Sequence, residues 1–176
     1  IMRKLGLLVL VAAALFIART AVFTVSEREV AIVTLFGDPI RTHQEAGLKV
    51  KAPLGIHQVI RIDRRLNVFE TQVIQLMLED RNPVIVTCFV TWKVVDPLAY
   101  YQSLGEATNA ELKLGDLVNS EMGSVLGKYV LTDVINTKEE SVKLDEIEAQ
   151  ILANTAMRAQ ETFGIEVVRI GIRRLG

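Results

Sequence analysis

The sequence predicts an α+β fold preceded by a single N-terminal transmembrane helix, and three observations lead to this prediction. Residues 5–18 form an apolar run without a charged side chain. Several β-branched runs follow, and the clearest of them, residues 84–95, presents one entirely apolar face. Two stretches with helical periodicity come next, and another β-branched run closes the chain. This order is typical of α+β proteins rather than of repeated βαβ units.

Composition and charge exclude several classes of protein. The 176 residues are 50% hydrophobic and 23% charged, as in ordinary globular chains. The net charge of −1 is unevenly distributed along the chain. Residues 1–25 hold three basic and no acidic residues, whereas residues 26–176 hold 17 basic and 21 acidic ones. A mildly acidic body argues against nucleic-acid binding. The single cysteine excludes an internal disulfide and a CxxC zinc site.

Residues 1–25 are predicted to be a membrane anchor. The 14 uncharged residues 5–18 make a helix about 21 Å long, and extension to residue 25 gives about 31 Å, enough for the hydrocarbon core of a bilayer. Arg3 and Lys4 predict that the N-terminus stays in the cytoplasm and that the body lies across the membrane. The large apolar side chains of the predicted anchor are Leu5, Leu7, Leu8, Leu10, Leu15, Phe16 and Ile17.

Two other interpretations of this segment stay open. The basic start followed by Ala12-Ala13-Ala14 resembles a cleaved signal peptide, although cleavage there leaves only seven apolar residues before the site. A buried helix of a soluble protein is the other interpretation. Arg19 and Arg28, beyond the apolar run, weaken the charge bias that sets the orientation.

The body is expected to begin with strands. The run at residues 30–36 is followed by Gly37-Asp38-Pro39, which predicts a strand ending in a turn. In the strand at residues 84–95, Cys88 is predicted to be a buried apolar residue rather than a reactive thiol. The core-facing side chains of that strand are Val84, Val86, Cys88, Val90, Trp92 and Val94. The other strands are expected at residues 47–53, 59–63 and 68–78, with a polar break at 79–83.

Helical signals follow this strand. Asp96-Pro97 predicts an N-cap and a first-turn proline for a short helix that continues through Tyr101. Apolar residues then recur at helical spacing between residues 114 and 129. That helix is expected to be interrupted by Gly115, Gly123 and Gly127.

The last helix and strand complete the predicted domain. An amphipathic helix over residues 138–163 is predicted to end at Gly164, before a strand over residues 165–172. One face of this helix carries Leu144, Ile147 and Ile151. The predicted organisation is therefore an anchor at residues 1–25, a membrane-proximal part at 26–75 and a second part at 76–176.

The sequence offers no motif that is specific for catalysis or cofactor binding. His43 and His57 lie in turn-like stretches without metal-ligand spacing, so a surface or packing role is expected for both. The GxSxG, SxxK, GxGxxG and Walker motifs are all missing. We therefore expect no enzyme, no catalytic residue, no metal and no cofactor. The rival hypothesis, a membrane-tethered exported hydrolase, requires a buried acid or histidine with a strongly shifted pKa in a cleft.

Two charged clusters have structural explanations. The carboxylates Glu139-Glu140 and Asp145-Glu146-Glu148 are expected on the solvated face of the last helix, near its N-terminal turn, where the helix dipole favours them. Arg169, Arg173 and Arg174 alternate with isoleucines near residue 176. They fit a solvated edge strand as well as a contact surface for an acidic partner.

Five segments resemble parts of the stomatin/prohibitin/flotillin (SPFH, or band 7) domain. Its opening resembles residues 25–39 (VSEREVAIVTLFGDP), 45–53 (EAGLKVKAP) and 59–65 (VIRIDRR). Its strand-to-helix junction is similar to residues 90–101 (VTWKVVDPLAYY), and its closing strand to residues 164–175 (GIEVVRIGIRRL). Within this superfamily the chain most resembles the HflC family of bacterial membrane proteins.

The resemblance implies a non-enzymatic subunit of a large ring or cage in the bacterial inner membrane, with the SPFH domain on the periplasmic side. The implied partners are copies of the chain, an HflK-like paralogue, an FtsH-like membrane protease and membrane lipid. The alternative is a stomatin-like lipid-microdomain scaffold without a protease partner. Family members continue into a coiled coil after the closing strand, and the present sequence reaches Gly176 without one.

Overall fold

The computed structural model describes residue 19 and residues 22–50, 57–135 and 143–175. They belong to two compact units that divide between Arg64 and Arg65. The α+β class is confirmed, because strands form the first unit and strands with helices form the second. The structural division precedes the boundary predicted after residue 75, which lies inside a strand of the second unit. The predicted anchor lies outside the described residues except for its last few positions.

The first unit, Ile1–Arg64, contains two small antiparallel sheets. Its core is the middle strand of the larger sheet, in which Val30, Ala31, Ile32, Val33 and Thr34 are all buried. That sheet has the order β3 (Asp38–His43), β2 (Glu29–Leu35) and β5 (His57–Asp63). The smaller sheet pairs β1 (Val22–Val25) with β4 (Gly47–Val50).

The turn predicted at Gly37-Asp38-Pro39 is placed differently in the structure. The turn residues are Phe36 and Gly37, with φ of 52° and 97°, and both conformations suit a two-residue hairpin loop. Asp38 and Pro39 already belong to β3. Proline is tolerated there because β3 is an edge strand, so the missing N–H breaks no continuous ladder.

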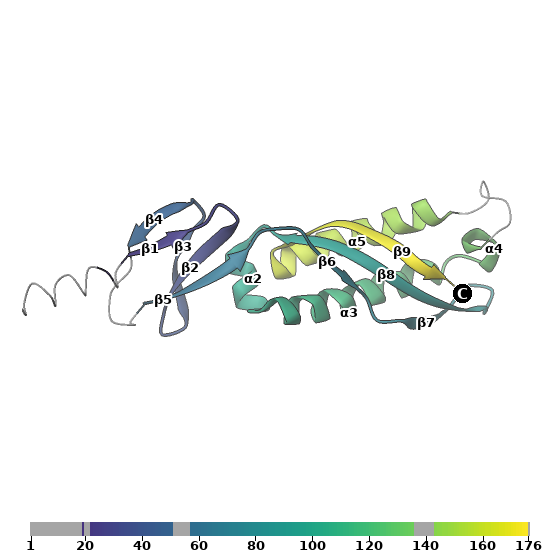
Figure 1. Cartoon of the computed structure of the whole chain (residues 1–176). Helices are drawn as coiled ribbons and strands as arrows, with labels where there is room; N and C mark the ends of the chain where they lie inside the picture. Colours follow the sequence, from purple (N-terminus) through teal and green to yellow (C-terminus); the bar gives the residue numbers. More distant parts are fainter. Residues whose placement is uncertain (1–18, 20–21, 51–56, 136–142, 176) are drawn as a thin grey trace, which may run out of the picture. The chain divides into compact units, whose positions relative to one another are not determined.

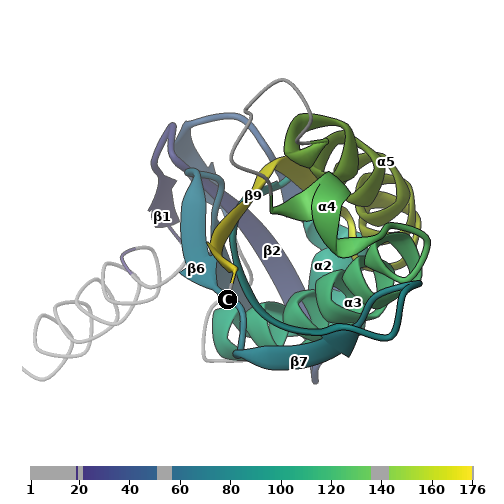
Figure 2. The same ribbon diagram turned by 90° about the vertical axis from the view of Figure 1, so that its right-hand side faces the viewer.

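The second unit, Arg65–Gly176, is built on one long strand, β8 (Pro83–Val94). Along one edge β8 pairs with β6 (Asn67–Glu70) and β7 (Ile74–Met77), and along the other with β9 (Ile165–Leu175), always antiparallel. The helices α3 (Ala107–Leu126) and α5 (Leu144–Phe163) lie against one face of this sheet (Figures 1 and 2). The short helices are α2 (Pro97–Ser103) and α4 (Leu131–Val134).

The single strand predicted at residues 68–78 is wrong, because Thr71 separates it into β6 and β7. The Thr71 hydroxyl oxygen accepts a hydrogen bond from the Cys88 backbone N–H at 3.1 Å. The Thr71 N–H donates to the Cys88 carbonyl at 2.8 Å. One threonine thus satisfies both backbone groups of a β8 residue and turns the chain out of the ladder at that point.

The predicted core face of β8 is confirmed. Its six side chains, from Val84 to Val94 at alternate positions, are each at most 3% exposed, and Trp92 stacks on Tyr100 of α2 with ring centroids 6.3 Å apart. Thr87 is also buried, although it belongs to the other face. A register shift between Thr87 and Cys88 in the pairing with β9 accompanies this exception.

The predicted helix ends at Asp96 and Gly164 are confirmed. The Asp96 carboxylate accepts hydrogen bonds from the N–H groups of Leu98 and Ala99, at 3.0 and 3.1 Å, and so caps α2. Gly164 ends α5 with φ of 64°, and a Cβ there would lie only 2.5 Å from the Asp96 carbonyl oxygen. The Gly164 carbonyl accepts from the N–H of Asp96 at 3.0 Å, so the two helix ends fix each other.

Of the three glycines expected to interrupt the helix after residue 114, Gly115 and Gly123 do not do so, whereas the helix does stop at Gly127. α3 is continuous through Gly115 and Gly123 and ends before Gly127. Gly115 and Gly123 face Phe69 of β6 and Leu76 of β7, so small residues allow these strands to pack closely on the helix. The helix predicted at residues 138–163 is confirmed from Leu144 onward, with Ile147 and Ile151 fully buried. Lys143 is the N-cap rather than a helical residue, and residues 138–142 lie outside the described residues.

Candidate functional site

The predicted anchor side chains cannot be placed, because residues 1–18 lie outside the described residues. They include both topology signals, Arg3 and Lys4, and all seven apolar residues, Leu5, Leu7, Leu8, Leu10, Leu15, Phe16 and Ile17. In the part of the chain that the structure does describe, no helix combines the length and the apolar character needed to cross a bilayer.

The two histidines lie on strands rather than in turns. His43 ends β3, where its ring meets the ring of Phe23 edge to face with centroids 6.0 Å apart. His57 begins β5. Among the described residues, no group of three or more histidine, cysteine, aspartate or glutamate side chains is placed to hold a metal ion. The expected packing role is observed for His43.

Cys88 lies fully buried on the core face of β8, as predicted. Its Sγ is 3.1 Å from Sδ of Met122 in α3. Burial, with a smaller contribution from the charge of Glu148, raises the pKa of the Cys88 thiol to about 12. A thiol with that pKa is not an effective nucleophile near neutral pH.

The carboxylates of α5 do more than cover a solvated face. Glu148 accepts a hydrogen bond from the backbone N–H of Ile172 in β9 at 2.7 Å, and Glu146 contacts the Tyr129 hydroxyl. On the facing helix, Glu121 is buried and forms an ion pair with Arg158 of α5. These contacts tie α5 to α3 and to β9. Glu139 and Glu140 lie outside the described residues.

Arg169 and Arg173 of β9 lie on the sheet face opposite the helices. The Arg169 guanidinium lies 5.7 Å from the centroid of the Phe89 ring, and Arg173 forms an ion pair with Glu70 of β6 at 2.7 Å. Arg173 therefore reaches across β8 to the opposite edge of the sheet. Lys93 and Glu166 form a third cross-strand contact at 3.0 Å.

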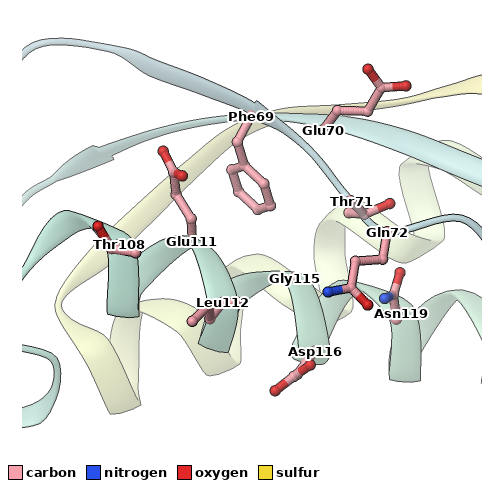
Figure 3. Close-up of a pocket in the computed structure, with 10 residues that line it drawn as sticks. All are labelled: Phe69, Glu70, Thr71, Gln72, Thr108, Glu111, Leu112, Gly115, Asp116 and Asn119. Carbon is pink, nitrogen blue, oxygen red and sulfur yellow. The ribbon is translucent and has the colours of Figure 1, made fainter.

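A groove lies between β6 and α3 in the second unit (Figure 3). Its volume is about 250 Å³. The Phe69 ring projects into it from β6, and Glu111 stands beside that ring on the helix (Figure 3). At the other end the side-chain amides of Gln72 and Asn119 lie close together, whereas the carboxylate of Asp116 points away from the strand (Figure 3).

The chemistry of this groove suits binding rather than catalysis. Glu111 and Asp116 have no basic partner in the described part of the chain, and Glu70 at the rim is neutralised by Arg173. The buried Oδ1 atom of Asn119 also has no hydrogen-bond partner there. Carboxylates and an amide oxygen beside an aromatic ring favour a cationic, hydrogen-bond-donating group.

The groove was missed in the sequence because its lining comes from two separate segments. A signal for one wall was present, since polar residues recur at helical spacing on α3 along one side of its buried stripe. The α3 residues that line the groove are Thr108, Glu111, Leu112, Gly115, Asp116 and Asn119. The other wall depends on the break at Thr71, which no local pattern indicates.

Comparison with known proteins agrees with this architecture. The chain is 26% identical to HflC of Vibrio parahaemolyticus, over 99% of the chain and 63% of that protein. It is 28% identical to the modulator of FtsH protease HflC of Escherichia coli K12, over 75% of the chain and 42% of that protein. HflC of Treponema pallidum is 27% identical, over 65% of the chain and 34% of that protein.

The chain spans between about a third and two thirds of the length of these relatives. The SPFH domain / Band 7 family matches residues 23–176, which include every strand and long helix described above except the first residue of β1. The chain belongs to the SPFH domain / Band 7 family.

Proposed function

We propose that the protein is a non-enzymatic, membrane-anchored subunit of a large ring or cage that modulates an FtsH-type membrane protease. The observation that carries this proposal is the similarity of residues 23–176 to the SPFH domain together with relatives named HflC, one of which is named a modulator of FtsH protease. The proposed partners are further copies of the chain, an HflK-like paralogue, the protease and membrane lipid.

The proposed mechanism is steric. An anchor at residues 1–25 would hold every copy at one height above the membrane, which raises the effective concentration of neighbouring domains and reduces the orientational freedom lost on association. Individually weak side-by-side contacts can then hold collectively. A wall of adjacent domains would restrict the access of substrates to the enclosed protease without performing chemistry itself.

Contacts between distant segments of the second unit support a role as a wall element. The Asp96–Gly164 contact joins α2 to the end of α5, and the Glu121–Arg158 ion pair joins α3 to α5. Both contacts connect segments far apart in the sequence, so they tie the helical layer together. A unit stabilised in this way can transmit a lateral contact without deforming.

We infer from Arg3 and Lys4 that the N-terminus is cytoplasmic and that residues 26–176 lie in the periplasm. A cysteine introduced at the exposed Gln44 should react with a membrane-impermeant maleimide added from the periplasmic side of intact cells. Labelling only after access to the cytoplasmic side would contradict the orientation.

The protease role is tested by deleting the gene and following membrane-protein turnover. The half-lives of membrane-protein substrates should change, whereas the intrinsic peptidase rate of the purified protease should not, because the ring acts on access. Unchanged half-lives for all substrates tested would contradict the proposal. They would favour the stomatin-like lipid scaffold instead.

A further inference from the structure

We propose that the open edge of β6 binds an extended segment of the HflK-like paralogue, which enters the groove between β6 and α3 as an added β-strand. The inference rests on the proposed function, because it names the contact by which this chain meets its neighbour in a ring shared with a paralogue. It concerns residues of the second unit alone.

The backbone of β6 has open hydrogen-bonding groups along one side. In the described part of the chain, β6 pairs with β8 alone. The Thr71 N–H donates to the Cys88 carbonyl, and bonded positions alternate along an antiparallel pair, so the backbone groups of Phe69 also face β8. The N–H and C=O groups of Val68 and Glu70 therefore face the open edge. An extended backbone is the ligand that matches such a row of donors and acceptors.

The groove lies along this strand. α3 forms its opposite wall, and the β6 side contributes Phe69, Glu70, Thr71 and Gln72 (Figure 3). A strand added to β6 directs alternate side chains toward the helices and toward the opposite face of the sheet. Those of the first set would enter the groove, and those of the second would lie beside the side chain of Val68. The backbone would then supply affinity, and the groove would select the side chains.

The two faces of β6 define the side chains that the added strand should carry. On the face opposite the helices, Leu66 and Val68 are 58% and 64% exposed, so an apolar side chain of the added strand would bury apolar surface there. On the helix side, Glu111 has no basic partner among the described residues, so it disfavours an acidic side chain. The expected segment therefore alternates apolar residues with basic or uncharged polar ones.

The two edges of the sheet differ in their protection against strand pairing. β9, at the far edge, has two register shifts in its pairing with β8, and Glu148 occupies the backbone N–H of Ile172. Residues 66–78, by contrast, hold no proline or glycine and one charged residue, Glu70, which is paired with Arg173. An uncharged edge with high β-propensity aggregates unless it is covered.

This requirement for a lasting cover identifies the source of the added strand. A substrate that passes to the protease would cover the edge only briefly, whereas a subunit of the same ring covers it for the lifetime of the assembly. In a ring shared with a paralogue, the neighbour of each copy of this chain is the paralogue.

The test removes the outward N–H of β6 without changing its pairing with β8. Val68→Pro does this, since proline is tolerated on an edge strand where the lost N–H faces outward. Val68→Thr is the matched control, because it keeps both the N–H and the β-branched shape. Leu112→Trp fills the groove from α3, and Met157→Trp, at an exposed apolar position of α5, is its control.

Each variant is co-expressed with the paralogue and extracted with its anchor in mild detergent, and the protein concentration needed for half-assembly is measured. Val68→Pro and Leu112→Trp should each raise that concentration by about tenfold, whereas each control should change it by less than about twofold. Thermal unfolding of each variant separates loss of contact from loss of folding. If Val68→Pro does not fold, Leu112→Trp and hydrogen exchange decide the outcome.

Hydrogen exchange of the unmodified protein locates the contact without any substitution. The amides of Val68 and Glu70 should exchange rapidly in the absence of the paralogue and be protected by about tenfold or more in the complex. Protection that is already present without the paralogue would overturn the proposal and indicate a second copy of this chain as the occupant.

Two further results would overturn the groove contact while leaving the ring intact. One is a folded Val68→Pro or Leu112→Trp variant that assembles with the paralogue as the unmodified protein does. The other is a complex with the paralogue in which residues 66–70 gain no protection. If the unmodified protein does not bind the paralogue at all, the ring itself is contradicted, and this contact with it.

Discussion

The ring of Phe89 occupies the space above Gly171, its partner across β8 and β9. A Cβ placed on Gly171 would lie 2.3 Å from two atoms of that ring, and the guanidinium of Arg169 lies 5.7 Å from its centroid. Phe89, Gly171 and Arg169 therefore form one cluster on the exposed face of the sheet. The close approach explains a glycine in the middle of a strand, a position where it otherwise weakens the sheet.

This relationship predicts that Gly171→Ala changes the free energy of unfolding in opposite directions in the presence and in the absence of the Phe89 ring. Gly171→Ala should destabilise the protein by about 1 kcal/mol, since overpacking costs about 1–3 kcal/mol and removal of a strand glycine returns about 0.5–1 kcal/mol. In the Phe89→Ala background the same change should be stabilising, because the space is then empty. Chemical denaturation of the four proteins measures both effects, and the same sign in both backgrounds would contradict the packing described.

Substitutions at Trp92 and Thr91 test which side chains of β8 point into the core. Trp92 is 1% exposed, so Trp92→Ala should cost roughly 3–5 kcal/mol through lost burial and a cavity. Thr91 lies half-buried on the other face, so Thr91→Ala should cost less than about 1 kcal/mol. Equal melting temperatures for the two variants would contradict the assignment of Trp92 to the core face and of Thr91 to the opposite face.

Asp80 predicts a pH dependence of stability. Its carboxylate accepts a hydrogen bond from the backbone N–H of Leu131 at 3.0 Å, and this bond, more than those from Asn82, lowers the pKa of the carboxyl. A lowered pKa in the folded state means that the stabilisation is complete above the ordinary pKa of about 4 and is lost as the pH falls through the lowered value.

The unfolding midpoint should therefore fall on acidification, and part of that fall should be missing in Asp80→Asn. Melting curves of both proteins between pH 7 and pH 3 measure the difference. Parallel curves over the whole range would show that Asp80 does not link the β7–β8 turn to α4.

Cys88 is expected to be chemically silent in the folded protein. With a pKa of about 12, only about one thiol in 10⁴ is ionised at pH 8, and burial excludes the reagent as well. Ellman's reagent at pH 8 should react with Cys88 only after denaturation. Rapid reaction of the native protein would contradict its burial, and would also require removal of Cys88 before the Gln44 labelling experiment.

Local signals in the sequence were sufficient to predict much of the structure of the second unit. Asp96 and Gly164 were predicted as helix ends because capping depends on one residue and its immediate neighbours. The core face of β8 was predicted because apolar residues at every second position of a long β-branched run all lie on the same face of a strand. The SPFH resemblance of the sequence was likewise confirmed.

Contacts between distant segments could not be predicted. Thr71 divides β6 from β7 through hydrogen bonds with Cys88, 17 residues away, and the ion pair between Glu70 and Arg173 spans 103 residues. Both contacts involve residues of the groove, since Glu70 and Thr71 are among its lining residues. Nothing in a single sequence without aligned relatives indicates which distant side chains will meet.

Assembly is the property that tests the proposed function most directly. The full-length protein should be extracted from its own membrane in mild detergent, its mass determined and the co-purifying chains identified. The account predicts a high-order complex that contains an HflK-like chain and an FtsH-type protease. A protein that runs as a monomer, with no protease bound, would contradict it.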